Sequence, residues 1–418
     1  TAIYHRPESE YAYLYKEGQL HIRIRTKKND VQQVILHYGD PFIFIEDKYE
    51  AKKEMTKVTS DALFDYWQVT VSVGFARIQY LFELLDEEGQ GVFYGDKGCV
   101  EHTQENLDAD GNGFKLPYIH EIDGCQVPDW VSNTVWYQIF PERFANGNPN
   151  LTPDGAREWD AAIAPNIDDF FGGDLQGIID HLDYLKDLGI TGLYLCPIFE
   201  ATTNHKYDTT DYFEIDRHFG DKEVFRNLVE EAHKRSIKIM LDAVFNHIGY
   251  QSAQWQDVLK NGENSPYKDW FHIQEFPVTE DKLQNPRQLP YHTFAFASYM
   301  PKLNTANPEV RDYLLSVATY WIENFDIDAW RLDVANEIDH QFWKDFRKAV
   351  LAKKPDLYIL GEIWHTSQPW LQGDEFHAVM NYPLSESIKD YFLRQRKKTE
   401  QFISEINSQS MYYKQQIS

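Results

Sequence analysis

The chain has 418 residues and a formal net charge of −25, and aromatic residues make up 15% of it. This length favours more than one domain, and so acidic a chain is poorly suited to nucleic acid or an anionic membrane surface. No apolar run approaches the ~18 residues of a bilayer span, so we expect neither nucleic acid nor a membrane as a partner.

The cysteines give a first indication of the compartment. Cys99, Cys125 and Cys196 are few and far apart, with neither metal-ligand spacing nor a disulfide framework. The first residues show no basic-then-apolar export signal. We therefore expect a cytoplasmic protein.

Residues 1–122 have the pattern of an all-β domain. Apolar and polar residues alternate over 20–25 and again over 69–73, which is the period of a half-buried strand. Turn-forming residues such as Gly18 and Gly39 separate these runs. The pattern predicts an N-terminal β-sandwich.

Residues 123–418 alternate between strand and helix patterns. The candidate strands are VWYQIF (135–140), ITGLYL (190–195), IKIMLD (237–242), IDAWRLD (327–333), LYILGE (357–362) and AVMNY (378–382). The candidate helices are 175–188, 221–236, 309–324 and 340–353. Apolar strands alternating with amphipathic helices indicate a parallel sheet covered by helices, here a (β/α)8-type TIM barrel.

Two features modify this barrel. The segment 246–305 is too long for a simple loop and predicts a small inserted lobe after the third strand. The chain offers about six strand candidates, whereas a closed barrel needs eight. We therefore expect an incomplete barrel, cut from a longer protein.

Acidic residues stand where three successive strands should end. Asp242 ends the third strand, Asp333 the fourth and Glu362 the fifth, and the carboxyl ends of barrel strands carry the chemistry of such folds. Arg331 lies two residues before Asp333, so both side chains point the same way and the cation should favour ionised Asp333. A helix cap or a salt bridge is the structural alternative for any single one of these acids.

Two carboxylates on neighbouring strand ends suit a retaining glycosidase, which needs a nucleophile and a proton donor. Asp333 fits the first role, and Glu362 fits the second if a dry setting or a nearby anion keeps it protonated. Tyr207 and His247 lie just beyond strand ends and are placed to donate hydrogen bonds to sugar hydroxyls.

Five short segments resemble the signatures of the α-amylase superfamily of glycoside hydrolases. They are NHKYDTTDY (204–212), DAVFNH (242–247), MPKLN (300–304), WRLDVANE (330–337) and LGEIW (360–364). MPKLN and VANE are similar to the subgroup of neopullulanases, cyclomaltodextrinases and maltogenic amylases, whose members carry an N-terminal sandwich before the barrel.

The resemblance implies a retaining hydrolase of α-1,4 and some α-1,6 bonds in cyclodextrins, pullulan and maltooligosaccharides. It implies that Asp333 is the nucleophile, that Glu362 is the general acid/base and that Arg331 supports Asp333. The implied sugar-binding residues are Tyr207, His247 and Asp242 on the non-reducing side of the cut, and Asn336 and Glu337 at the next sugar. It also implies a homodimer formed through the N-terminal domain.

The segments RFANGNPN (143–150) and FFGGD (170–174) resemble a calcium site of several family members. The implied ligands are Asn146, Asn148, the Gly172 carbonyl and Asp174. Leu151 and Thr152 stand where the family has further ligands, and calcium prefers six to eight oxygens. We expect no organic cofactor.

The chain also departs from the family pattern. No His-Asp pair, which would mark the family's third catalytic Asp, follows Glu362, and the family's C-terminal β-domain is missing. Two alternatives therefore stay open: a transglycosylase that acts on the same substrates, and a non-catalytic glucan-binding protein.

Overall fold

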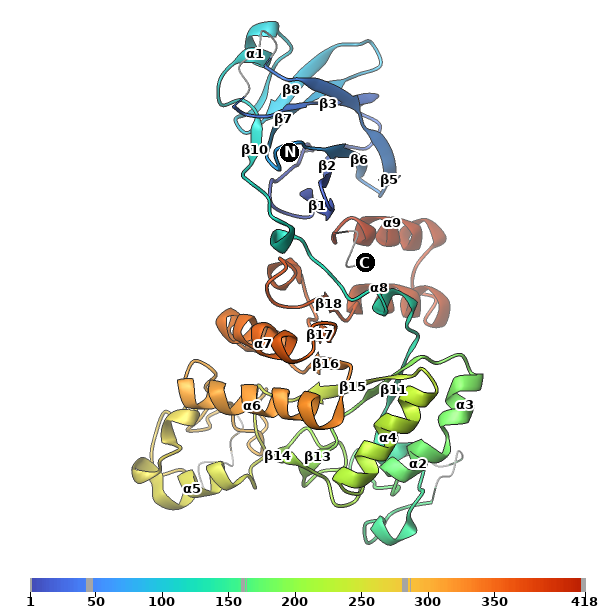
Figure 1. Ribbon diagram of the computed structural model, residues 1–418, viewed down its shortest axis with the longest axis vertical. Coiled ribbons are helices and arrows are strands. Elements are labelled where there is room, and N and C mark those ends of the chain that lie inside the picture. The colour runs from blue at the N-terminus through green and yellow to red at the C-terminus, as the bar shows by residue number, and fades with distance from the viewer. Residues whose placement is uncertain are drawn as a thin grey trace. The chain divides into compact units, whose positions relative to one another are not determined.

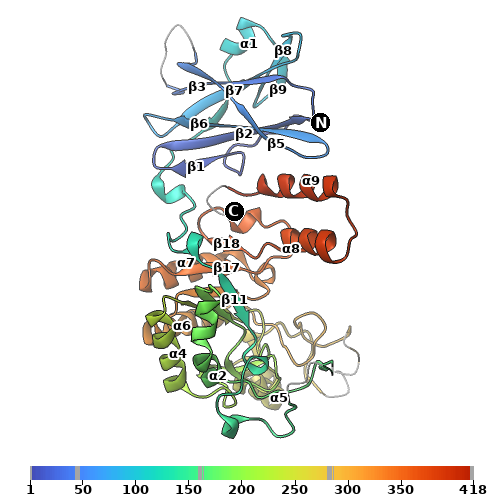
Figure 2. The same ribbon diagram turned by 90° about the vertical axis from the view of Figure 1, so that its right-hand side faces the viewer.

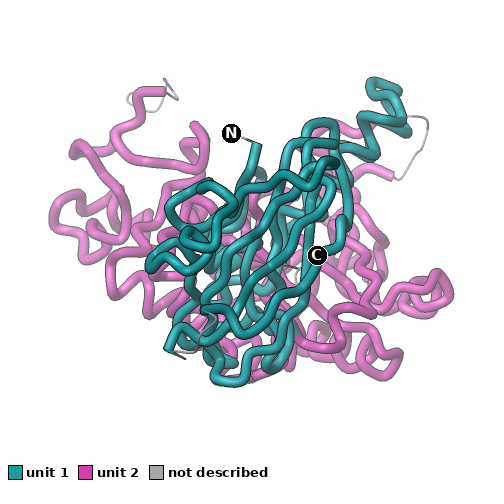
Figure 3. The backbone as a smooth tube through the Cα atoms, turned by 90° about the horizontal axis from the view of Figure 1, so that it is seen from above, with its two compact units in different colours: residues 1–127, 364–418 teal, residues 128–363 magenta. Residues whose placement is uncertain are grey.

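The computed structural model describes residues 2–42, 48–158, 162, 164–279, 285 and 287–414. It contains two compact units (Figure 3): unit 1 comprises residues 1–127 and 364–418, and unit 2 comprises residues 128–363. In the described ranges, no helix has the length and apolar character needed to cross a bilayer.

Unit 1 contains two antiparallel sheets stacked face to face (Figure 2). The first has the order β1-β2-β6-β5, and the second has the order β4-β3-β7-β8-β9 with β10 also paired to β7. The strands are β1 (Ala12–Lys16), β2 (Gln19–Lys27), β3 (Gln33–Gly39), β4 (Ala51–Glu54), β5 (Thr56–Ser60), β6 (Phe64–Ser72), β7 (Ile78–Leu85), β8 (Gly91–Gly95), β9 (Gly98–Glu101) and β10 (Phe114–Leu116). The predicted β-sandwich is confirmed.

The sandwich core follows the alternation seen in the sequence. Leu20, Ile22 and Ile24 of β2 are completely buried and pack in one apolar cluster with residues of β6 and β7. The polar face of β2 is buried as well, which the alternation did not predict. A 3.0 Å hydrogen bond joins the His21 ring to the Tyr13 hydroxyl. The Arg23 guanidinium lies 5.3 Å from the centre of the Tyr13 ring. The prediction of a half-buried strand is therefore wrong for this face, because the rings of Tyr13 and Tyr15 lie against His21 and the Tyr413 carbonyl accepts a hydrogen bond from Arg23.

The other elements of unit 1 are mostly short. They are α1 (Gln104–Asp108), η1 (Glu121–Asp123), η9 (Gln368–Trp370), β18 (Ala378–Val379), α8 (Tyr382–Ile388), η10 (Lys389–Leu393) and α9 (Thr399–Ser410). Strand β18 is the sixth of the strands predicted after residue 123.

Unit 2 is built on a parallel sheet whose strands follow chain order. They are β11 (Trp136–Ile139), β12 (Gly192–Leu195), β15 (Lys238–Ala243), β16 (Ala329–Leu332) and β17 (Tyr358–Gly361). Between β12 and β15 in the chain, β13 (Phe199–Ala201) and β14 (Thr209–Ile215) form a separate antiparallel pair. Together with β18, these parallel strands confirm the predicted incomplete barrel of about six strands.

Helices connect successive strands of this sheet (Figure 1). They are α2 (Leu175–Asp180), α3 (Leu182–Asp187), α4 (Lys222–Lys234), α5 (Ala253–Asn261), α6 (Pro308–Phe325) and α7 (His340–Lys353). The helix predicted over 221–236 is α4, and Asp221 precedes it as its cap: the Asp221 side chain accepts hydrogen bonds from the backbone N–H groups of Glu223 and Val224. The helix predicted over 175–188 is divided between α2 and α3 at His181, whose backbone leaves the helical conformation.

Short 3-10 turns complete unit 2, and η5 and η6 lie in the segment 246–305. They are η2 (Val131–Asn133), η3 (Pro141–Arg143), η4 (Pro149–Leu151), η5 (Gly262–Asn264), η6 (Lys268–Trp270) and η8 (Ala335–Glu337). Within 246–305, the fully buried Trp255 packs against the rings of Phe271 and Tyr291 at centroid distances of 4.7 and 4.5 Å. This segment thus has an apolar centre of its own. Residues 280–284 and 286 of the expected lobe lie outside the described residues.

Candidate active site

The register of the parallel sheet brings the predicted acidic residues together. Asp242 of β15 pairs directly with Arg331 of β16. The Asp333 N–H donates to the Ala243 carbonyl at 3.1 Å, and the Glu362 N–H donates to the Leu332 carbonyl at 3.0 Å. Each acid therefore continues the hydrogen-bond ladder at the carboxyl end of its strand, which is the edge where barrel enzymes hold their catalytic groups.

The Arg331 guanidinium is the centre of the cluster. Its Nη1 lies 2.9 Å from both carboxylate oxygens of Asp242 and 2.7 Å from Asp333 Oδ1. Its Nη2 lies 2.8 Å from Glu362 Oε1. Three carboxyl groups thus share one cation, and the structure places the three predicted acids and Arg331 in one site.

Burial sets the electrostatics of this cluster. Asp242, Arg331, Asp333 and Glu362 are all less than 8% exposed. Burial raises the pKa of Asp242, and burial together with the charge of Asp242 raises the pKa of Asp333 well above its usual value, although Arg331 opposes both shifts. The expectation that Arg331 would favour ionised Asp333 is thus outweighed. One guanidinium therefore faces three buried carboxyl groups, and its single positive charge does not prevent the pKa of Asp242 and that of Asp333 from rising.

Tyr207 and His247 extend the cluster on the side of Asp242. The Tyr207 hydroxyl donates to Asp242 Oδ2 at 3.0 Å, and His247 Nε2 lies 3.0 Å from the Tyr207 carbonyl oxygen. Burial lowers the pKa of His247 to about 3, so this imidazole is neutral near pH 7. Both predicted residues therefore stand beside the acids, with Tyr207 in direct contact.

Tyr194 belongs to the same cluster, and the sequence analysis missed it. It lies on β12, and its hydroxyl donates to Asp242 Oδ2 at 2.5 Å. The available signal was its place within the apolar strand ITGLYL, one residue before the strand ends. A buried tyrosine there needs a hydrogen-bond partner, and Asp242 supplies it.

Asn336 and Glu337 lie on the turn η8, which follows Asp333 almost directly. Lys302 of the MPKLN segment donates from Nζ to the Glu337 carbonyl at 2.8 Å and also contacts the Asn246 side-chain oxygen. Lys302 and Glu337 line a pocket of about 540 Å³ together with Tyr291 and His292. Through Glu337, the turn η8 therefore borders this pocket, a few residues after Asp333 in the chain.

The residues predicted as calcium ligands are engaged in other interactions. The buried Asp174 carboxylate accepts hydrogen bonds from the backbone N–H groups of Gly147, Asn148 and Gly177 and thereby caps α2. The Asn148 side-chain oxygen accepts from the Asn150 N–H at 3.2 Å. These are structural roles for the oxygens that a metal would need.

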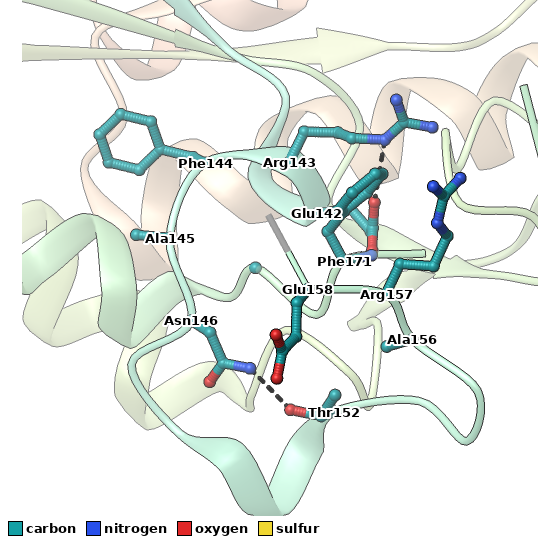
Figure 4. A pocket seen from close by; sticks show the side chains of 11 residues that line it. Glu142, Arg143, Phe144, Ala145, Asn146, Thr152, Ala156, Arg157, Glu158 and Phe171 are labelled. Atoms are coloured by element: carbon teal, nitrogen blue, oxygen red, sulfur yellow. Dashed lines mark hydrogen bonds and ion pairs between the residues drawn. The ribbon is translucent and has the colours of Figure 1, made fainter. Parts of the chain in front are cut away.

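Asn146 and Gly172 meet at the same place. Asn146 donates from its amide to the Thr152 hydroxyl at 2.7 Å, and both side chains border a pocket of about 330 Å³ (Figure 4). A Cβ atom on Gly172, whose φ is +76°, would lie 2.7 Å from the Thr152 methyl group. As arranged, these residues do not form a cage of six to eight oxygens. No cluster of three or more His, Cys, Asp or Glu suited to a metal occurs in the described ranges, and calcium stays a prediction.

Comparison with known proteins adds the following. Residues 138–418 match the family described as "Alpha amylase, catalytic domain", and residues 1–120 match "Alpha amylase, N-terminal ig-like domain". The chain is 53% identical over 412 residues to an intracellular maltogenic amylase of Bacillus subtilis, covering 98% of this chain and 68% of that protein. It is 54% identical over 418 residues to a cyclomaltodextrinase of Geobacillus thermopakistaniensis, covering 100% of this chain and 70% of that protein.

The fold has a close counterpart among solved structures. A cyclomaltodextrinase structure aligns with a TM-score of 0.92 at 46% identity, over 99% of this chain and 69% of that chain. The sequence signatures, the two matched domains and the cluster of acids at the strand ends therefore all indicate the same family.

Proposed function

This chain belongs to the alpha-amylase family of hydrolases, and from that premise we propose that it cleaves α-1,4 and some α-1,6 glucosidic bonds with retention of configuration. The proposed substrates are cyclodextrins, pullulan and maltooligosaccharides. The names of its relatives support this range, since they include a cyclomaltodextrinase, a maltogenic amylase and a neopullulanase.

One observation carries the proposal: the two terminal nitrogens of Arg331 hold Asp333 and Glu362 side by side. Retaining glycosidases need their two carboxyl groups only ~5–5.5 Å apart, whereas inverting enzymes leave room for a water between them. Two carboxyl groups bonded to one guanidinium are held close together, which supports the closer spacing of a retaining enzyme.

In the proposed mechanism, Asp333 attacks the anomeric carbon while Glu362 protonates the departing glycosidic oxygen, giving a covalent glycosyl-enzyme. Glu362 then removes a proton from a water molecule, which attacks the same carbon and releases Asp333. Arg331 orients both carboxylates throughout. Tyr207 and Tyr194 hold Asp242 at the sugar pocket, and His247 is the neutral imidazole beside it.

The test uses the whole protein and the variant Asp333→Asn. We expect wild type to release sugar whose anomeric configuration matches that of the substrate when the product is followed by NMR within the first minutes. The Asn variant should still bind glucan but lose turnover, by about 10⁴-fold or more. Unchanged turnover, or a product of inverted configuration, would exclude the mechanism.

Substrate choice and acceptor need a separate measurement. Cyclodextrin, pullulan and starch assayed side by side give the preferred substrate, and a labelled sugar acceptor distinguishes hydrolysis from transglycosylation. We expect cyclodextrin to be cleaved fastest. A protein that binds these glucans without cleaving any of them would instead be the non-catalytic glucan-binding protein.

We also propose a cytoplasmic location and a homodimer formed through the N-terminal domain. The location is supported by the three cysteines, none of which forms a disulfide, and by the name of the Bacillus subtilis relative. Cell fractionation tests the location, and sedimentation of the whole protein with and without residues 1–120 tests the dimer.

A further inference from the structure

The residue after the proposed nucleophile has an unfavourable backbone. Val334 has φ +46° and ψ +40°, the left-handed helical conformation. Glycine and, less often, Asn or Asp adopt this conformation readily, but a β-branched side chain there is a true outlier. Such strain persists only where the surrounding structure enforces it, and it gathers at functional sites.

This backbone conformation aims one N–H group at the proposed acid/base. The Val334 N–H donates to Glu362 Oε2 at 3.0 Å, while Arg331 Nη2 holds Oε1 at 2.8 Å. Both oxygens of the Glu362 carboxylate are thus held by the segment 331–334. The Glu362 backbone is held there too, through its N–H on the Leu332 carbonyl.

The segment that holds Glu362 also carries Asp333. Leu332 and Val334 flank Asp333 and bind Glu362 from either side, and the Glu337 N–H donates to the Val334 carbonyl at 3.0 Å to close the turn. The distance between the two carboxyl groups is therefore set by three consecutive residues. A small error in such a distance is costly, because a misplacement of about 1 Å can reduce rate 10²-fold.

We propose that Val334 is a positioning residue whose strained, left-handed backbone fixes the N–H that orients the Glu362 carboxylate. The inference rests on the proposed function, since it acts through the acid–base role of Glu362. The β-branched side chain restricts the backbone once the fold has forced it into this conformation. Glycine would fit the conformation more easily but would hold the N–H less firmly.

The experiment compares Val334→Gly with Val334→Thr in the whole protein, with Ser236→Gly as the matched control. Ser236 also has a left-handed backbone, with φ +60°, but it is exposed after helix α4. For Val334→Gly we expect an unfolding midpoint at or above that of wild type, an unchanged KM and a kcat on cyclodextrin reduced about tenfold. That loss is part of the ~10²–10⁴-fold that a general acid–base contributes.

Two readouts separate positioning from a purely structural role. A nitrophenyl maltooligoside should lose much less rate in Val334→Gly, because nitrophenolate departs without a proton from Glu362. The alkaline limb of the kcat profile should move to higher pH, because a hydrogen bond to a carboxylate favours its ionised form. Val334→Thr should recover most of the lost kcat, and Ser236→Gly should leave kcat unchanged.

Opposite results would overturn the inference. Wild-type kcat and pH profile in Val334→Gly would show that the strain does not position Glu362. Equal losses on both substrates with a lower unfolding midpoint would show a structural role alone. Glu362→Gln, included in the same series, identifies a failure of the proposed function: if that variant keeps its activity, the acid–base assignment itself is wrong.

Discussion

The two ends of strand β16 carry buried acids with opposite electrostatics. At the carboxyl end, Asp333 shares the Arg331 guanidinium with two other carboxyl groups, and its pKa is raised. At the amino end, the single carboxylate of Asp328 faces three basic side chains, those of His233, Lys238 and Lys354. Burial also acts to raise the pKa of Asp328, but the hydrogen bond from His233 and the charge of Lys354 lower it overall.

The partners of Asp328 show what a satisfied acid looks like. Its carboxylate lies 2.7 Å from His233 Nε2, 2.9 Å from Lys238 Nζ and 3.1 Å from Lys354 Nζ, and it accepts the Ile239 N–H at 2.9 Å. The negative charge of Asp328 is therefore balanced by neighbouring basic groups, and its oxygens are hydrogen-bonded. The comparison teaches that a shortage of cations, rather than burial, distinguishes a chemical site from a structural one in this sheet.

The largest expected effect is at the carboxyl end. Glu362→Gln should reduce kcat on maltooligosaccharides by about 10³-fold, within the range a general acid–base contributes. The free energy of unfolding should change by less than about 1 kcal/mol, because Asp242 and Asp333 still share the Arg331 guanidinium after Glu362 is replaced. Steady-state kinetics and urea unfolding measure the two quantities. A large loss of stability would place Glu362 with Asp328 as a structural acid.

The amino end should respond in the opposite way. Asp328→Asn leaves three basic side chains without their shared anion, and we expect a loss of about 3 kcal/mol in the free energy of unfolding. The kcat of the folded protein should stay within about twofold of wild type, because Asp328 lies at the other end of the strand from the site. A fall in kcat comparable to that of Glu362→Gln would show that Asp328 is not a purely structural acid.

The pH dependence of stability should have opposite signs at the two ends. Asp328 has a lowered pKa in the folded state, so its contribution is present above about pH 3.8 and is lost as the pH falls below that value. Asp242 has a raised pKa, so its contribution is present below about pH 3.8 and is lost as the pH rises through the folded pKa.

Urea unfolding from pH 3 to pH 8 tests this difference in variants of each acid. The penalty for Asp328→Asn should shrink as the pH falls below about 4. The penalty for Asp242→Asn should shrink as the pH rises. Parallel curves for the two variants would contradict the opposite pKa shifts.

The smallest expected effect concerns a single partner of Asp328. The Lys238 side chain is 33% exposed, whereas that of Asp328 is 1% exposed. Lys238→Met should cost less than about 1 kcal/mol, because water and salt screen the pair and two other basic side chains remain. The cost should shrink further in 1 M salt. A loss equal to that of Asp328→Asn would mean that Lys238 alone neutralises the acid.

Much of this arrangement was predictable from the sequence. Asp242, Asp333 and Glu362 were found because each ends an apolar run, and parallel strands place such residues at one edge. Arg331 followed from the two-residue period of a strand. The six strands and the sandwich followed from hydrophobic periodicity, and the motif resemblance supplied Asn336 and Glu337.

The missed features depend on contacts between distant segments. Asp328 looks like an ordinary residue near the start of a predicted strand, because its partners are distant in the chain: His233 lies on helix α4 and Lys354 follows helix α7. His21 and Arg23 have the pattern of an exposed face, but contacts with Tyr13, Tyr15 and the distant Tyr413 bury them. The strained backbone of Val334 could not be predicted from residue propensity, because valine favours strands. The left-handed conformation arises only where the chain turns toward Glu362.

The direct pairing of Asp242 with Arg331 limits how this enzyme can change in evolution or in the laboratory. Side chains on a strand alternate between faces, so inserting or deleting one residue within β15 or β16 would turn one of the pair away from the other. Lengthening the loops beyond these strands leaves the pairing intact. Libraries aimed at new sugar preferences should therefore vary loop length freely and keep the residue count of both strands constant.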